Sequence, residues 1–104
     1  MERITEIKQL KPGDKIWTIN AFTGAVDIIE FVCVHPHNPE YSIFLNGNYD
    51  GMPKFYNEHL KDAEYERYDG SNECWTRIHL AELGWHRWRM SRIEERIKNG
   101  RKKP

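Results

Sequence analysis

The run from Ala25 to Val34 limits the fold of this 104-residue chain more than any other segment. Its side chains alternate as in a β-strand, and both faces are apolar. A strand of this kind belongs inside a barrel or a sandwich, or crosses a sheet that is covered on both sides. We therefore expect it in the main core. One face carries Ile28, Val32 and Val34, and the other carries Ile29, Phe31 and Cys33. Of these, Ile28, Phe31 and Val32 are predicted to lie in the main core.

Turn signals on both sides of this run predict further strands. A Pro-Gly pair at residues 12–13 leads into a strand expected at residues 15–19, and a loop of hairpin length at residues 20–24 follows. Two prolines within residues 35–39 break the central strand. Residues 57–69 have no clear period, so an irregular segment, a short helix and an edge strand all stay open. Further strands are expected at residues 41–45, 54–56 and 74–78.

A helix is predicted from about residue 81 to residue 98, with Gly100 as its stop signal and a frayed basic tail at residues 100–104. At 100° per residue the helix has two different faces. One is an apolar stripe with the spacing of a core-facing surface: Leu83, His86, Met90, Ile93 and Ile97. The opposite face carries Ala81, Trp85, Trp88, Arg89, Arg92 and Arg96.

These elements predict a single α+β domain, since one core is the natural number for this length. We expect four or five antiparallel strands in a small, partly open β-barrel or a strongly bent sheet, closed on one side by the C-terminal helix. The β-rich body would span about residues 10–78.

The segment Leu10-Lys11-Pro12-Gly13-Asp14-Lys15-Ile16-Trp17, followed by a hairpin, resembles the first-strand entry of SH3-like small barrels. Many uncharacterised proteins of phages and mobile elements share this opening and finish with a helix. The resemblance covers about the first 45 residues and implies a fold more than a function. It implies no binding residue, because no functional motif of such a family is matched.

The charge is divided along the chain although the formal net charge is zero. Residues 1–73 contain 7 Lys or Arg and 13 Asp or Glu, a net charge of −6. Residues 74–104 contain 9 Lys or Arg and 3 Asp or Glu, a net charge of +6. This division indicates either an anionic partner for the basic end or docking of the helix on an acidic body. The acidic body belongs to the same chain or, in a homo-oligomer, to a neighbouring copy.

No metal, cofactor or catalytic residue is expected. Cys33, His35 and His37 alternate as metal ligands on a strand would, but Pro36 interrupts that strand. Cys33 and Cys74 are expected to be buried free thiols. The chain has no GxSxG, P-loop or HExxH motif. An enzyme without a recognisable motif is therefore only the third alternative for its function.

The helix face with two tryptophans among arginines is the strongest candidate binding surface, and three explanations compete for it. The Trp pair can pack on the β-rich body while the arginines reach outward. It can instead form a protein interface, because Trp and Arg are enriched at binding hot spots. Nucleic acid is the third option, with arginines on phosphates and indoles stacked on bases. The predicted partner-binding residues are Trp85, Trp88, Arg89, Arg92 and Arg96, with Tyr49 and Tyr56 from the acidic, tyrosine-rich middle region.

The sequence has no apolar run of membrane-spanning length, and residues 1–6 lack the apolar stretch of a signal peptide. A cytoplasmic location without a membrane partner is expected. The favoured function is a non-enzymatic binding module, a protein-binding accessory or inhibitory factor of a phage or mobile element. A nucleic-acid-binding module is the alternative.

Overall fold

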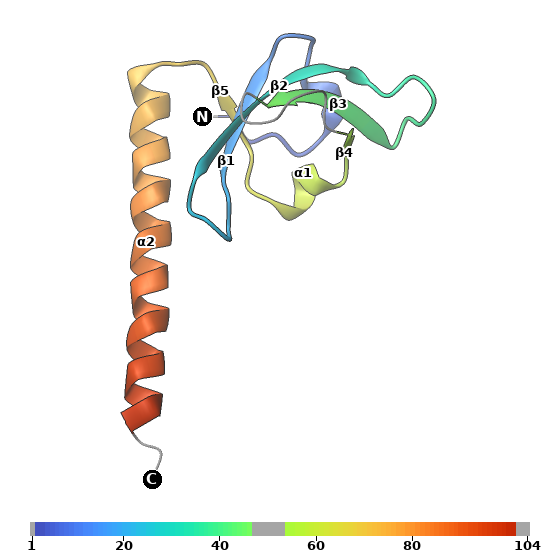
Figure 1. Cartoon of the computed structure of the whole chain (residues 1–104). Coiled ribbons are helices and arrows are strands. Elements are labelled where there is room, and N and C mark those ends of the chain that lie inside the picture. Colours follow the sequence, from blue (N-terminus) through green and yellow to red (C-terminus); the bar gives the residue numbers. More distant parts are fainter. Residues whose placement is uncertain (1, 47–53, 102–104) are drawn as a thin grey trace.

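The structure is a computed structural model that describes residues 2–46 and 54–101. Five antiparallel strands form one sheet in the order β4-β3-β2-β1-β5, and a long helix follows them (Figure 1). The edge strands β4 and β5 lie at opposite ends of this order, so the described sheet is not closed into a barrel. The elements are η1 (Ile7–Gln9), β1 (Lys15–Ile19), β2 (Val26–Val34), β3 (Tyr41–Asn46), β4 (Lys54–Tyr56), α1 (His59–Asp62), β5 (Glu66–Tyr68) and α2 (Asn72–Arg101).

This architecture confirms the predicted α+β class, with an open sheet and a C-terminal helix. The strands expected at residues 15–19, 41–45 and 54–56 are present. The segment at residues 57–69, for which three states stayed open, contains both a short helix, α1, and an edge strand, β5. β5 pairs with β1 on the side away from β2.

The central strand β2 is covered on both faces, as its apolar pattern predicts. Ile29 and Phe31 are buried in the main core, which the N-terminal segment, β1, β3 and α1 complete. Ile28, on the other face, is half-buried against a second cluster of Trp17, Cys74 and Ile78, where α2 meets the sheet. The prediction is therefore right for Phe31. Ile28 belongs instead to the second cluster, and Val32 is only half-buried, at a register shift between Phe31 and Cys33.

Arg67 on β5 ties the N-terminal segment to the turn before β1. Its guanidinium donates to Glu2 Oε1 at 3.0 Å, to Asp14 Oδ2 at 2.9 Å and to the Gln9 carbonyl oxygen at 2.8 Å. The hydrogen bond from Arg67 lowers the pKa of the Glu2 carboxyl. The pKa of Asp14 is lowered first by the backbone N–H of Lys11 and then by Arg67.

Helix α2 begins earlier than the sequence predicts. The strand expected at residues 74–78 is wrong, because these residues form the first turns of the helix. Ser71 precedes the helix, and its Oγ accepts the backbone N–H of Cys74 at 3.1 Å, as an N-cap residue does. The helix also continues through Gly100 to Arg101. The remainder of the predicted tail, residues 102–104, lies outside the described residues.

Candidate functional site

The first half of α2 is docked on the sheet through one face. Cys74 and Ile78 are fully buried on that face, next to Trp17. Farther along, the indole Nε1–H of Trp85 donates to the Ala21 carbonyl oxygen at 3.0 Å. Gly24 lies under the same ring, because a Cβ at that position would overlap Trp85 Cε3 and Cζ3. Trp85 therefore attaches α2 to the loop of the β1–β2 hairpin.

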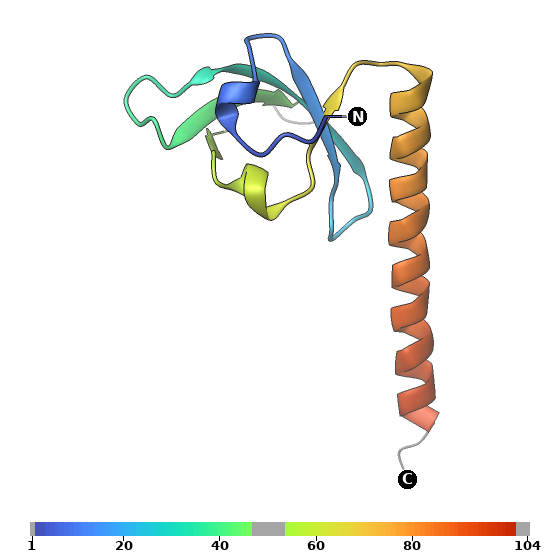
Figure 2. The ribbon, with the colours of Figure 1, turned by 180° about the vertical axis from the view of Figure 1, so that it is seen from behind.

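Beyond Trp85 the helix has no further cover from the sheet. Every residue from 86 to 100 is exposed, and we call this segment the free half of α2. Figures 1 and 2 show it running past the hairpin and away from the sheet. The molecule is correspondingly long, with principal extents of 59 × 33 × 25 Å. The free half is therefore a protruding element of this fold.

The apolar stripe of Leu83, His86, Met90, Ile93 and Ile97 does not face the core, so that prediction is wrong. The exposed fractions are 44% for Leu83, 55% for Met90, 37% for Ile93 and 50% for Ile97. The docked residues, Cys74, Ile78 and Trp85, lie on the other side of the helix. Because α2 starts nine residues before its predicted start, its early turns fix which face meets the sheet.

The tryptophan–arginine face lies partly in contact with the body and partly in solvent. Trp85 is docked, whereas Trp88 is 56% exposed. The guanidinium carbon of Arg92 lies 5.9 Å from the centre of the Trp88 ring, and that of Arg89 lies 5.4 Å from the Trp85 ring. Within residues 2–46 and 54–101, no carboxylate forms an ion pair with Arg89, Arg92 or Arg96. Packing on the body thus accounts for a tryptophan at residue 85 but not for the exposed tryptophan at residue 88.

Tyr56, one of the two tyrosines predicted to bind a partner, is not brought to this face. Tyr56 lies on the edge strand β4, where its ring is 5.4 Å from that of Tyr41 and 5.7 Å from that of His59. The helix contacts β1, which β3 and β2 separate from β4. Tyr49 lies outside the described residues. The part of the predicted site that lies on one face of α2 is therefore the two tryptophans and the three arginines, with Arg89 near Trp85 and Arg92 near Trp88.

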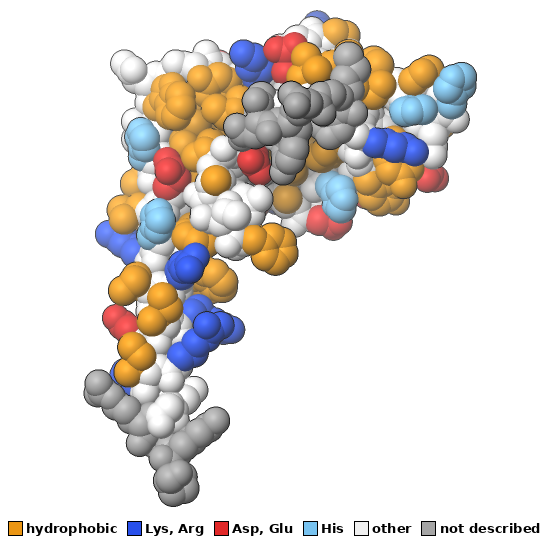
Figure 3. Space-filling model, in the orientation of Figure 1, with side chains coloured by type: hydrophobic (Ala, Val, Ile, Leu, Met, Phe, Trp, Pro, Cys, Tyr) orange, Lys and Arg blue, Asp and Glu red, His pale blue; other side chains and the backbone are white. Residues whose placement is uncertain are grey.

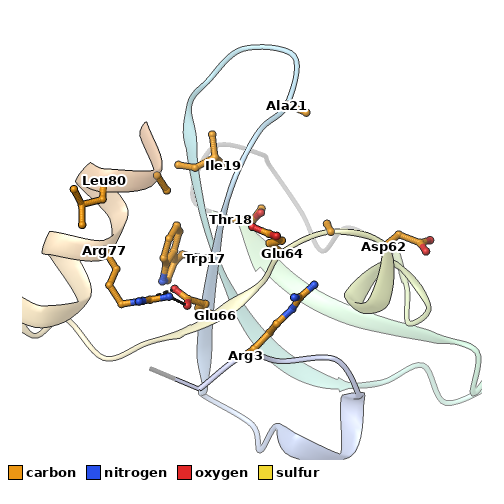
Figure 4. A pocket seen from close by; sticks show the side chains of 12 residues that line it. Arg3, Trp17, Thr18, Ile19, Ala21, Asp62, Glu64, Glu66, Arg77 and Leu80 are labelled. Atoms are coloured by element: carbon orange, nitrogen blue, oxygen red, sulfur yellow. Dashed lines mark hydrogen bonds and ion pairs between the residues drawn. The ribbon is translucent and has the colours of Figure 1, made fainter. Parts of the chain in front are cut away.

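A cleft of about 760 Å³ lies between the docked half of α2, β1 and the segment before β5 (Figure 4). Glu66 and Arg77 form a bidentate ion pair beside the Trp17 indole at its wall. The Trp17 Nε1–H is buried, and no described group accepts it. The lining residues include no Cys, His or Ser. Glu66 is thus held by the Arg77 guanidinium, and no thiol or imidazole stands among the lining residues.

Cys33, His35 and His37 do not form a ligand cluster. His35 Nδ1 accepts the backbone N–H of His37 at 3.2 Å, and the two imidazole rings meet edge to face with centres 6.0 Å apart. Among the described residues, no group of three or more His, Cys, Asp or Glu side chains is placed to hold a metal ion. The described helices also include none that is long and apolar enough to cross a bilayer.

Comparison with models of protein families, with curated proteins and with solved structures finds no match to this chain. The resemblance of residues 10–17 to the opening of SH3-like small barrels therefore stays a prediction.

Proposed function

We propose that this chain is a protein-binding module without catalytic activity, and that it binds its partner through Trp88, Arg89, Arg92 and Arg96. The proposal is carried by one observation. An indole that is 56% exposed stands on a protruding helix among arginines that have no carboxylate partner in the described part of the chain. Figure 3 shows hydrophobic and basic side chains side by side along the free half of α2.

The chemistry of this face defines the partner surface that would fit it. An indole contributes a large apolar area on few rotatable bonds, and Trp and Arg dominate binding hot spots. Arg92 already lies over the Trp88 ring, which keeps the two side chains close before binding. The complementary surface is an apolar pocket for the indole surrounded by Asp or Glu side chains. Occupying such a surface would make this chain an accessory or inhibitory factor.

A second candidate function, nucleic-acid binding, is favoured by the separation of charges in space. The free half of α2 carries five Lys or Arg and two Asp or Glu, a net charge of +3. Because it extends away from the acidic body, repulsion between that body and a polyanion is weaker than the sequence alone suggests. Arginines and an exposed indole also suit single strands. This function stays the alternative because the acidic body still lies on the same chain.

The first test is capture of the partner from the native host after nuclease treatment, followed by titration of the identified protein. Trp88→Ala should weaken binding by about 2 kcal/mol or more, which is roughly thirtyfold. The matched control is Lys98→Ala, an exposed basic residue on another side of the same helix. Equal affinities for the parent chain and the Trp88→Ala variant would disprove the proposed interface.

Salt dependence separates the two candidate functions. A protein interface anchored by Trp88 should tolerate moderate salt, whereas nucleic-acid binding should weaken steeply, because each neutralised phosphate releases condensed counterions. Gel-shift titrations with single- and double-stranded DNA and RNA measure the second possibility. Micromolar or tighter binding near physiological salt that Arg89→Ala with Arg92→Ala abolishes would replace the protein-binding proposal with the alternative.

A further inference from the structure

The apolar stripe of α2 has the spacing of a coiled-coil seam. Its members follow one another at intervals of three, four, three and four residues, which is the heptad pattern. In that pattern Leu83, Met90 and Ile97 occupy a positions, and His86 and Ile93 occupy d positions. Four of the five are apolar and at least 37% exposed. The stripe thus presents an apolar surface, interrupted at His86, that the sheet does not cover.

The body of the protein lies on the far side of the helix from this seam. Cys74, which docks α2 on the sheet, occupies an f position when the heptad pattern is continued toward the start of the helix. Ile78 and Trp85, which also contact the body, occupy c positions. Positions c and f point away from a coiled-coil partner. A second helix can therefore lie along the stripe without meeting the sheet.

Charges beside the stripe indicate which helix would fit. In a parallel pair, each g position faces the e position five residues later on the other helix. For two copies of this chain in register, Glu82 of one faces Arg87 of the other, and Arg89 faces Glu94. Each attractive pair occurs twice. Arg96 lies opposite position 101, which is also an arginine in the sequence, so this one pair opposes the association.

An antiparallel pair of the same helices is less favourable. There g positions face g positions and e positions face e positions. A register with Arg89 opposite Arg89 also places Glu82 opposite Arg96, and a register with Arg89 opposite Arg96 also places Arg87 opposite Glu94. Each antiparallel register thus combines repulsive with attractive pairs and has fewer attractive pairs than the parallel register. Like charges at these positions oppose association. The charge pattern therefore favours a second copy of this chain in the parallel orientation.

We propose that two copies of this chain associate through the stripe as a parallel two-stranded coiled coil. The free halves of the two α2 helices pair along Leu83, His86, Met90, Ile93 and Ile97. Trp88, at position f, and Arg92, at position c, stay on the outer surface of the pair. This inference does not rest on the protein-binding proposal. If both hold, the dimer presents two copies of the Trp88 surface.

Sedimentation velocity of the full chain over about a hundredfold range of concentration tests the association, because the dimer fraction must rise with concentration. Ile93→Glu places a charge in the seam and should raise the dimer dissociation constant at least about tenfold. Ser91→Glu adds the same side chain at an exposed b position of the same helix and should leave the dissociation constant nearly unchanged. Circular dichroism of both variants checks that the fold is kept.

The orientation is tested by an Ile97→Cys variant under mild oxidation. In the parallel register the two introduced thiols face each other and form a disulfide-linked dimer, whereas in an antiparallel pair they lie at opposite ends. A monomer at every concentration, an association that Ile93→Glu leaves unchanged, or an absent Ile97→Cys crosslink would each overturn the proposal. A head-to-tail contact between acidic body and basic helix would appear as an association that moderate salt abolishes, which also overturns it.

Discussion

At the scale of single residues, the contact between Gly24 and Trp85 holds α2 against the β1–β2 hairpin. Gly24 has a φ of +74°, a backbone angle that residues with a side chain rarely adopt. The indole of Trp85 occupies the space where a Cβ at residue 24 would lie. The same indole donates its N–H to the neighbouring Ala21 carbonyl oxygen. Replacing hydrogen by methyl at residue 24 therefore affects both the backbone and the helix contact.

Gly24→Ala should lower the free energy of unfolding by about 1–3 kcal/mol, because it combines backbone strain with displacement of the Trp85 ring. Gly84→Ala is the matched control. Gly84 is in a helix, and beyond the backbone of that helix no described group lies within 4 Å of a Cβ at this position, so this change should raise stability by about 0.5–1 kcal/mol. Urea unfolding measures both. A Gly24→Ala protein as stable as the parent would show that the indole is not held at this position.

The residue scale is also where the sequence is least informative. The helical period groups Trp85 and Trp88 on one face and predicts no difference between them. Their different exposure arises because the β1–β2 hairpin reaches Trp85 and ends there. Nothing local in the sequence states how far along a helix a distant loop will reach. The arginines near both rings are predictable from spacing alone, since residues three and four apart are neighbours on a helix.

At the scale of elements, β2 supports two layers at once. Phe31 packs in the main core with its ring centre 5.5 Å from that of Phe44, and Ile28 contributes to the cluster under α2. Strands of this kind were predictable because turn residues surround them and their apolar pattern has period two. A defect in β2 should consequently affect both the main core and the cluster under α2.

Phe31→Ala should destabilise the protein by about 3–5 kcal/mol, since it removes a buried aromatic ring and leaves a cavity. Phe22→Ala is the control, because Phe22 is 91% exposed in the hairpin loop and should contribute little. Thermal and urea unfolding compare the two variants. Parent-like stability of Phe31→Ala would place β2 outside the core and contradict the sheet described above.

Residues 74–78 show where element prediction fails. Cys-Trp-Thr-Arg-Ile is rich in β-branched and aromatic side chains, which favour strands. Tertiary contacts override that preference: Cys74 and Ile78, four residues apart, are both buried beside Trp17, as neighbours on one face of a helix are. Ser71 is the signal that could have shown the true start, because serine is a preferred N-cap residue.

At the scale of the whole molecule, the N-terminal segment, the turn before β1 and the edge strand β5 depend on one guanidinium. Arg67 lowers the pKa of the Glu2 carboxyl and contributes to lowering that of Asp14. A carboxyl with a lowered pKa in the folded state stabilises the fold above its ordinary pKa. That contribution is lost as the pH falls, because the unfolded chain then binds protons more readily.

The free energy of unfolding should therefore decline as the pH falls below about 4.5, the ordinary pKa of Glu2, and continue to decline below that of Asp14, 3.8. An Arg67→Met variant should be less stable near neutral pH and should lose less stability on acidification. Lys8→Met, which removes an exposed ion pair with Glu6, is the control and should follow the parent. The midpoints of urea unfolding, measured for the parent and both variants across this pH range, test these expectations. An unchanged pH profile in Arg67→Met would refute the role given to Arg67.

The free half of α2 also fixes the angle between the body and any partner that binds to this part of the helix. Docked and free residues belong to one continuous helix, so the number of residues between them fixes both distance and direction. From Trp85 to residue 100 the helix reaches about 22 Å, and each inserted residue would turn the outer face by about 100° while moving it outward by about 1.5 Å. Seven inserted residues would restore the direction to within about 20°. The free half thus has a defined rotational orientation relative to the body as well as a defined length.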